Sequence, residues 1–215
     1  MKFKVLTKFH PKGLNTKRKI MTKEFKNLFD LLISSNPDNV YLAFALAQNF
    51  KEEFEKYVKY SLEDYEELYR FLQPKAPLKG LLTGIKEVSF YISQKKTTYL
   101  PKSIKILKRV KRVDLISQEI KELPAEIGEM NNLQELILDN NPFKKFPKEI
   151  EKLEKLETIW LVDTNLESFP QELANIKNLK YLSFSGNDIN RFEDEIKELK
   201  EKKPLLKVEN DDVDY

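Results

Sequence analysis

The sequence predicts an α/β solenoid of about five or six parallel strands, preceded by a group of α-helices. Three observations support this. Apolar positions recur at a constant spacing, as from Leu133 to Leu156 to Leu179, over more than half of the 215-residue chain. Within each repeat they alternate along a short segment, as in a strand with one buried face. Before the repeats, residues 22–73 instead show the three- and four-residue spacing of amphipathic helices.

The repeat keeps about nine positions in phase. One copy contains Leu133, Leu136, Leu138, Asn141, Phe143, Phe146, Pro147, Ile150 and Leu153. Equivalent copies begin at Val110, Leu156 and Leu179, and a weaker one begins at Phe90. A one-residue insertion then places Leu206 and Val208 as a last strand. Self-similarity with such a period is typical of stacked repeat proteins.

The repeat unit also has a physical interpretation. Leu136 and Leu138 are two residues apart, so on a strand they face the same side. Asn141 ends the strand, where its amide can bind backbone groups. Pro147 fixes the backbone after the bend, and the apolar residues that follow have the spacing of a short helical return segment. Because a single unit cannot bury its apolar row, the units must stack.

This pattern, L-x-x-L-x-L-x-x-N-x-L followed by x-x-[LF]-P-x-x-I-x-x-L, resembles the short leucine-rich repeats of bacterial and Ras-suppressor-like proteins. The resemblance covers residues from about 86 to 208 and implies a right-handed β-α solenoid. It also implies a protein–protein interaction module without catalysis of its own. Gln118, Thr164 and Lys95 replace the usual Asn, and Glu193 replaces the Pro. We expect locally looser loops at these positions.

The segment before the repeats predicts helices that cover the first repeat. Residues 22–34 have one apolar face, Pro37 begins a second helix, and a third pattern contains Phe54. Ser61 and Asp64 resemble a capping box at the start of a further helix. We therefore divide the chain into a basic arm (1–20), a helical cap (21–80), the solenoid (81–208) and an acidic tail (209–215).

The composition excludes many kinds of chemistry. With no cysteine, the chain has no disulfide, thiolate metal site or thiol nucleophile, and its only histidine, His10, cannot form a multi-histidine site. Gly80 and Gly84 form no phosphate-binding motif. We interpret the acidic clusters at 52–55 and 63–67 as solvated helix faces, and Asp211, Asp212 and Asp214 as part of a tail rather than a cation site. We expect no enzyme activity, cofactor, metal or small-molecule substrate.

The best candidate for a binding surface is the sheet face that points away from the solenoid core, here named the concave face. Its apolar and aromatic side chains are not required by the core, and Trp and Tyr dominate interface hot spots. We expect an exposed apolar patch centred on Trp160, the only tryptophan. The alternative is that these side chains only pack on one another across the strands. The candidate partner-binding residues are Tyr91, Arg112, Asp114, Ile116, Glu135, Ile137, Asp139, Trp160, Val162 and Tyr181.

The charge is concentrated at the two ends. Residues 1–20 carry seven basic groups and no acid, and the tail carries four acids and no base, so these ends account for the whole net charge of +3. The basic arm gives an alternative function, weak binding of nucleic acid or an anionic surface. We favour a solubilising extension, because the remaining residues are neutral overall. We expect a cytoplasmic bacterial monomer that binds an unidentified protein and has neither a secretory signal nor a membrane span.

Overall fold

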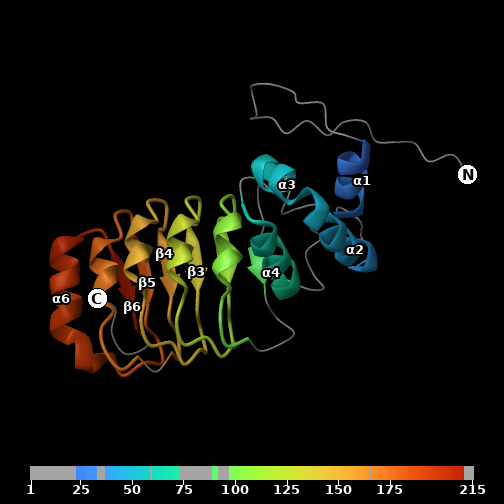
Figure 1. Ribbon diagram of the computed structural model, residues 1–215. Coiled ribbons are helices and arrows are strands. Elements are labelled where there is room, and N and C mark those ends of the chain that lie inside the picture. The colour runs from blue at the N-terminus through green and yellow to red at the C-terminus, as the bar shows by residue number, and fades with distance from the viewer. Residues whose placement is uncertain are drawn as a thin grey trace, which may run out of the picture.

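The computed structural model describes residues 23–32, 37–58, 60–72, 89–91, 97–164 and 166–210. It confirms the predicted solenoid: six parallel strands form one sheet in the order of the chain. Figure 1 shows the repeats stacked side by side, with α-helices at the N-terminal end. The strands are β1 (Ser89–Tyr91), β2 (Arg112–Asp114), β3 (Glu135–Ile137), β4 (Thr158–Trp160), β5 (Tyr181–Ser183) and β6 (Lys207–Glu209).

The register between strands follows the repeat. Val113 pairs with Leu136, and Leu136 pairs with Ile159, each at the equivalent position of the next repeat. These central strand residues are fully buried, because they point to the core side of the sheet. The last step differs from our expectation: Leu182 pairs with Val208, whereas a one-residue insertion would bring Leu206 to that position.

The return segments explain this difference. In four repeats they are short 3-10 helices, namely η2 (Lys102–Ile106), η3 (Ala125–Glu129), η4 (Lys148–Lys152) and η5 (Gln171–Asn175). Each follows a proline with φ between −70° and −77°, which pre-sets the backbone. The last repeat has Glu193 instead and forms η6 (Ile189–Phe192) and then an α-helix, α6 (Glu193–Lys202). An α-helix rises less per residue than a 3-10 helix, so the same span takes more residues.

The turns after the strands are held by side-chain amides. Asn141 is buried; its Oδ1 accepts the N–H of Ile120 (3.0 Å), and its Nδ2 donates to the carbonyls of Leu115 and Leu138 (2.8 Å each). Where Thr164 replaces Asn, its hydroxyl donates to the Leu161 carbonyl at 2.9 Å. Gln118 is likewise buried and bonded, so these two departures do not leave the loose turns that we expected.

One position in each of these turns has a left-handed backbone. Ser117, Asn140, Asp163 and Gly186 have φ values of 55°, 55°, 52° and 71°, and they occupy equivalent positions in successive repeats. Glycine adopts this conformation without strain, and Asn and Asp tolerate it better than most residues. The turn therefore repeats with the same handedness, although four different residues occupy it.

The helical region contains α1 (Lys23–Leu32), α2 (Pro37–Ala47), η1 (Gln48–Phe50), α3 (Lys51–Val58) and α4 (Leu62–Leu72). The expected cap of α4 is present, because the Asp64 N–H donates to Ser61 Oγ (3.0 Å). α4 lies against the first turn of the solenoid (Figure 1), where Asp64 pairs with Lys105 (2.9 Å) and Glu67 accepts the N–H of Ser103 (3.1 Å). Within the described residues, no helix has the length and apolar character needed to cross a membrane.

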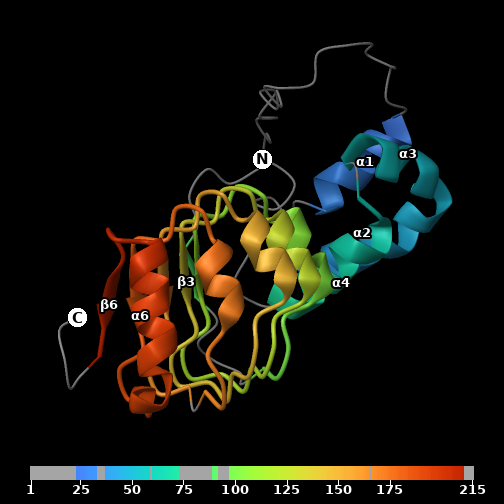
Figure 2. The ribbon, with the colours of Figure 1, turned by 90° about the vertical axis from the view of Figure 1, so that its left-hand side faces the viewer.

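At the other end, α6 and β6 complete the stack (Figures 1 and 2). Glu209, which we assigned to the acidic tail, is the last residue of β6. Several sequence-based expectations fall outside the described residues. They concern the basic arm (1–20) with His10, Gly80, Gly84 and the three tail aspartates.

Candidate functional site

The strands place the predicted residues of the concave face in two rows. The register aligns Arg112, Glu135, Thr158, Tyr181 and Lys207 in one row, and Asp114, Ile137, Trp160, Ser183 and Glu209 in the next. Neighbouring strands are about 4.8 Å apart, so side chains within a row touch one another. Tyr91 stands beside Asp114 in the register, but its side chain lies outside the described residues.

A chain of contacts crosses four of these strands. Arg112 Nη1 lies 2.5 Å from Glu135 Oε2, and Nη2 lies 3.4 Å from Asp114 Oδ2. The other oxygen of Glu135 accepts the indole N–H of Trp160 (3.2 Å). The Trp160 ring in turn packs on Tyr181, with ring centroids 4.9 Å apart and planes tilted by 49°. These four side chains, which come from both rows, therefore form a connected, partly exposed surface in which they hold one another in place.

The expected exposed apolar patch is not formed as predicted. Ile137 is 4% exposed and Asp114 is 5% exposed, so neither is available to a partner. Ile137 stands between Asp114 and Trp160 in the register, and the indole leans toward β3 because its N–H reaches Glu135. Arg112, Glu135, Trp160 and Tyr181 remain partly exposed, as do Ile116, Asp139 and Val162. Packing of the side chains on one another across the strands, the alternative to an exposed patch, thus accounts for part of the face.

Acidic side chains follow the strands on the same face. Asp139 Oδ1 accepts the N–H of Val162 on the next turn (2.9 Å). Burial raises the pKa of Asp139, and the nearby carboxylates of Asp114 and Asp163 raise it further. Asp163 and the β6 residues Lys207 and Glu209 were absent from our candidates. Asp163 is in phase with Ser117 and Asn140, which were not candidates, so the repeat period did not indicate it. The positions in β6 depend on the length of α6.

The largest exposed apolar side chains of the described residues lie away from the concave face. They are Tyr41, Leu42 and Leu46 on α2, Tyr99 before η2, and Leu205 before β6. α2 buries Val40 and Phe44 and leaves its opposite side uncovered by the described residues. The sequence predicts the start of this helix at Pro37, but it does not predict that Leu46 is exposed.

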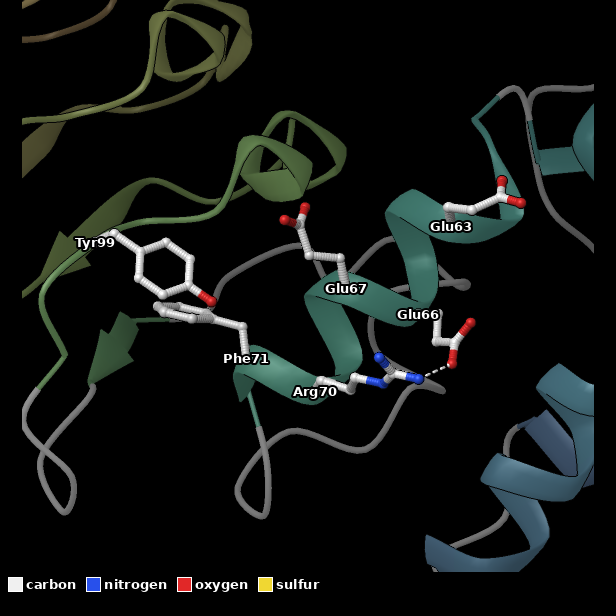
Figure 3. Close-up of a pocket in the computed structure, with 6 residues that line it drawn as sticks. All are labelled: Glu63, Glu66, Glu67, Arg70, Phe71 and Tyr99. Carbon is white, nitrogen blue, oxygen red and sulfur yellow. Dashed lines mark hydrogen bonds and ion pairs between the residues drawn. The ribbon is translucent and has the colours of Figure 1, made fainter.

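A pocket lies between α4 and the first repeat (Figure 3). It has a volume of about 380 Å³ and is lined by Glu63, Glu66, Glu67, Arg70, Phe71 and Tyr99. The rings of Phe71 and Tyr99 lie together, with centroids 6.1 Å apart, and Glu66 pairs with Arg70. This acidic cluster is therefore not simply a solvated helix face. Asp64 and Glu67 attach α4 to the solenoid, and Glu66 is engaged within the helix.

The described residues offer no grouping of three or more His, Asp or Glu side chains suited to hold a metal ion. On the concave face, Arg112, Glu135 and Trp160 are paired or hydrogen-bonded with one another, and the rings of Trp160 and Tyr181 are stacked.

Comparison with known proteins agrees with this architecture. Residues 90–207, more than half of the chain, match a family model described as a leucine-rich repeat region. The chain belongs to the leucine-rich repeat family. The family resemblance inferred from the repeat pattern is thus confirmed, while the subtype of the leucine-rich repeat stays a prediction.

Similar proteins come from bacteria and plants. A putative disease resistance protein of Arabidopsis thaliana is 44% identical over 64 residues, which are 30% of this chain and 4% of that protein. A leucine-rich repeat protein of Leptospira interrogans has 36% identity and a TM-score of 0.47, over 54% of this chain and 29% of that one. The leucine-rich repeat ectodomain of an Arabidopsis receptor kinase has 25% identity and a TM-score of 0.41, over 52% and 13%. The chain therefore spans less than a third of each of these proteins.

Proposed function

We propose that this leucine-rich repeat protein is a non-enzymatic module that binds a partner protein through its concave face. The observation that carries the proposal is the chain of contacts from Arg112 through Glu135 and Trp160 to Tyr181, across β2 to β5. Arg, Trp and Tyr are the residues most often found at interface hot spots. Their contacts hold the side chains in place before a partner arrives, which lowers the entropy cost of binding.

The packing of the core explains why these four side chains are available for binding. Folding requires the central residue of each strand, such as Leu136 or Ile159, and these point to the other side of the sheet. An aromatic pair on the open side is not needed to complete the core. The proposed contact residues are therefore Arg112, Glu135, Trp160 and Tyr181, with Ile116, Asp139, Val162 and Tyr91 around them.

In this proposal, α1 to α4 form a cap over the N-terminal end of the solenoid. The terminal repeat of a solenoid otherwise leaves its apolar side open to water. The ion pair between Asp64 and Lys105 and the position of the Lys108 ammonium over the Tyr60 ring (5.5 Å) support a fixed attachment. The protein would act as a cytoplasmic monomer without a cofactor.

The test is affinity capture with the full chain, comparing wild type with the Trp160→Ala/Tyr181→Ala variant. We expect the double variant to lose partners that the wild type retains, because truncation of a central aromatic typically costs about 2 kcal/mol or more. Tyr99→Ala is the matched control, since Tyr99 is an exposed aromatic residue (57%) away from the concave face. If the double variant folds normally and retains the same partners with unchanged affinity, the proposal is wrong.

Residues 1–20 carry the alternative function, weak binding of nucleic acid or an anionic surface, because seven basic groups occur there without an acid. This electrostatic binding would weaken steeply with salt. Titrating an oligonucleotide at two salt concentrations, with the wild type and with a variant lacking those charges, separates this function from the first.

A further inference from the structure

The concave face carries an excess of negative charge in its described part. Two basic residues, Arg112 and Lys207, lie on it. The acidic residues are Asp114, Glu135, Asp139, Asp163 and Glu209, so the net charge of this part is −3. The two cations lie at the first position of their strands. Most of the acids lie further along, toward the turns after the strands. The potential therefore becomes more negative from the start of the strands to their ends.

Within the part of the face that the structure describes, the pairing leaves several of these acids without a cation. Arg112 is shared between Glu135 and Asp114. Among the described residues, neither Asp139 nor Asp163 has an ion-pair partner, and the Asp139 carboxylate accepts the N–H of Val162. These two carboxylates lie on adjacent turns, near enough for Asp163 to disfavour the charge of Asp139. A cation bound between them would relieve this repulsion.

An aromatic platform lies beside the acids. Trp160 and Tyr181 are stacked and partly exposed, and the register places Trp160 on the strand between Asp139 and Tyr181. The faces of such rings attract Arg and Lys side chains, whose long stems also cover apolar surface. The acids and the rings therefore favour the same class of ligand.

We propose that the partner presents a basic, extended segment to the concave face, with Lys or Arg side chains on the Trp160–Tyr181 pair and beside Asp139 and Asp163. This inference rests on the proposed function and specifies the chemistry of the partner. The excess of negative charge disfavours nucleic acids and other polyanions on the same face, because like charges across an interface cost binding energy.

Trp160 makes the proposal directly testable, since it is the only tryptophan and its fluorescence reports on this face. The full chain is titrated with two short peptides, one of alternating Lys and Ser and one of alternating Glu and Ser. We expect only the Lys peptide to change the emission saturably, and its affinity to fall as salt rises from about 20 mM to about 200 mM, because salt screens exposed charges. Circular dichroism confirms that each variant is folded.

Two variants locate the charges. Asp139→Asn/Asp163→Asn removes two acids from the concave face, and we expect it to raise the Kd for the Lys peptide about tenfold. Glu154→Gln/Glu172→Gln is the matched control: it makes the same change of net charge on or next to the 3-10 helices η4 and η5. We expect this control to change the Kd by less than about twofold, since screened charges at a distance contribute little.

Three outcomes of these titrations would overturn the proposal. In the first, the Trp160 emission responds to the Glu peptide; in the second, it responds to neither peptide; in the third, both variants bind the Lys peptide with the same affinity. Each result would show that the face does not select basic segments. The capture experiment with Trp160→Ala/Tyr181→Ala could still succeed in each case, so the two proposals fail separately.

A third variant replaces the seven basic residues of 1–20 with Gln. If it binds the Lys peptide more tightly than wild type, the chain's own basic segment occupies the face and an external partner is not required.

Discussion

Replacing Gly186 with alanine tests how the left-handed turns hold the concave face. Gly186 has a φ of 71°, the conformation that glycine adopts most easily. A Cβ at this position would lie 1.9 Å from Asp163 Oδ1 and 2.7 Å from Asp163 Cγ, so the Asp163 side chain would have to move. The substitution thus adds two costs, one from the backbone and one from crowding.

The expected magnitude follows from these two costs. A left-handed residue other than glycine costs about 1–2 kcal/mol. The crowding adds about 1 kcal/mol, the lower end of the cost of overpacking, because Asp163 is exposed and its side chain can rotate. Gly186→Ala should therefore reduce the free energy of unfolding by about 2–3 kcal/mol in total.

Urea unfolding, followed by Trp160 fluorescence and by circular dichroism, measures this change. The same substitution in an Asp163→Gly background separates the two costs, because the crowding side chain is then absent. The cost of Gly186→Ala should fall to about 1–2 kcal/mol there, the backbone contribution alone. A total cost below about 0.5 kcal/mol, the range of ordinary surface substitutions, would refute the backbone argument. An equal cost in both backgrounds would refute the steric one.

Three further predictions concern the same turns. Asn141→Ala should destabilise the protein by about 3–5 kcal/mol in urea unfolding, because several buried backbone groups lose their hydrogen-bond partner. Substitution of the exposed Asn131 with Ala is the control, and an equal cost for both variants would contradict the prediction. Ser117→Asn should stabilise by about 0.5 kcal/mol, since Asn tolerates the left-handed φ of 55° better than Ser; a lower urea midpoint would count against this. Asp139→Asn keeps an oxygen for the Val162 N–H. Because the pKa of Asp139 is raised above its ordinary 3.8, its charged form costs stability once the pH exceeds that value. The variant should thus melt at a higher Tm than wild type at about pH 7 and at the same Tm at about pH 3, and a lower Tm at about pH 7 would contradict the prediction.

The repeated part of the fold could be predicted because its pattern is local. Residues such as Leu136 and Ile159 recur once in every repeat, and each repeat presents the same apolar row to its neighbours. Burying that row requires stacking, so the period alone predicts parallel strands and their register. Where the return segment changes from a 3-10 helix to α6, the period no longer holds and the register of β6 was predicted wrongly.

The candidate site was predicted only in part. The alternation of the strands correctly assigns Arg112, Glu135, Trp160 and Tyr181 to the face opposite the core. It does not predict that Trp160 donates to Glu135 or that Ile137 is buried. Such contacts depend on side-chain rotamers on different strands, and these are chosen jointly by neighbours far apart in the sequence.

The sequence by itself therefore determined the period, the strands, the buried row and the helical nature of residues 23–32, 37–58 and 62–72, because these depend on spacing along the chain. The tertiary structure decided which acids pair with Arg112, which acids of the described part have no cation beside them, and where α4 attaches to the solenoid. Exposure and charge pairing are properties of groups brought together from separate repeats. They depend on distances in space, which the spacing in the sequence does not specify.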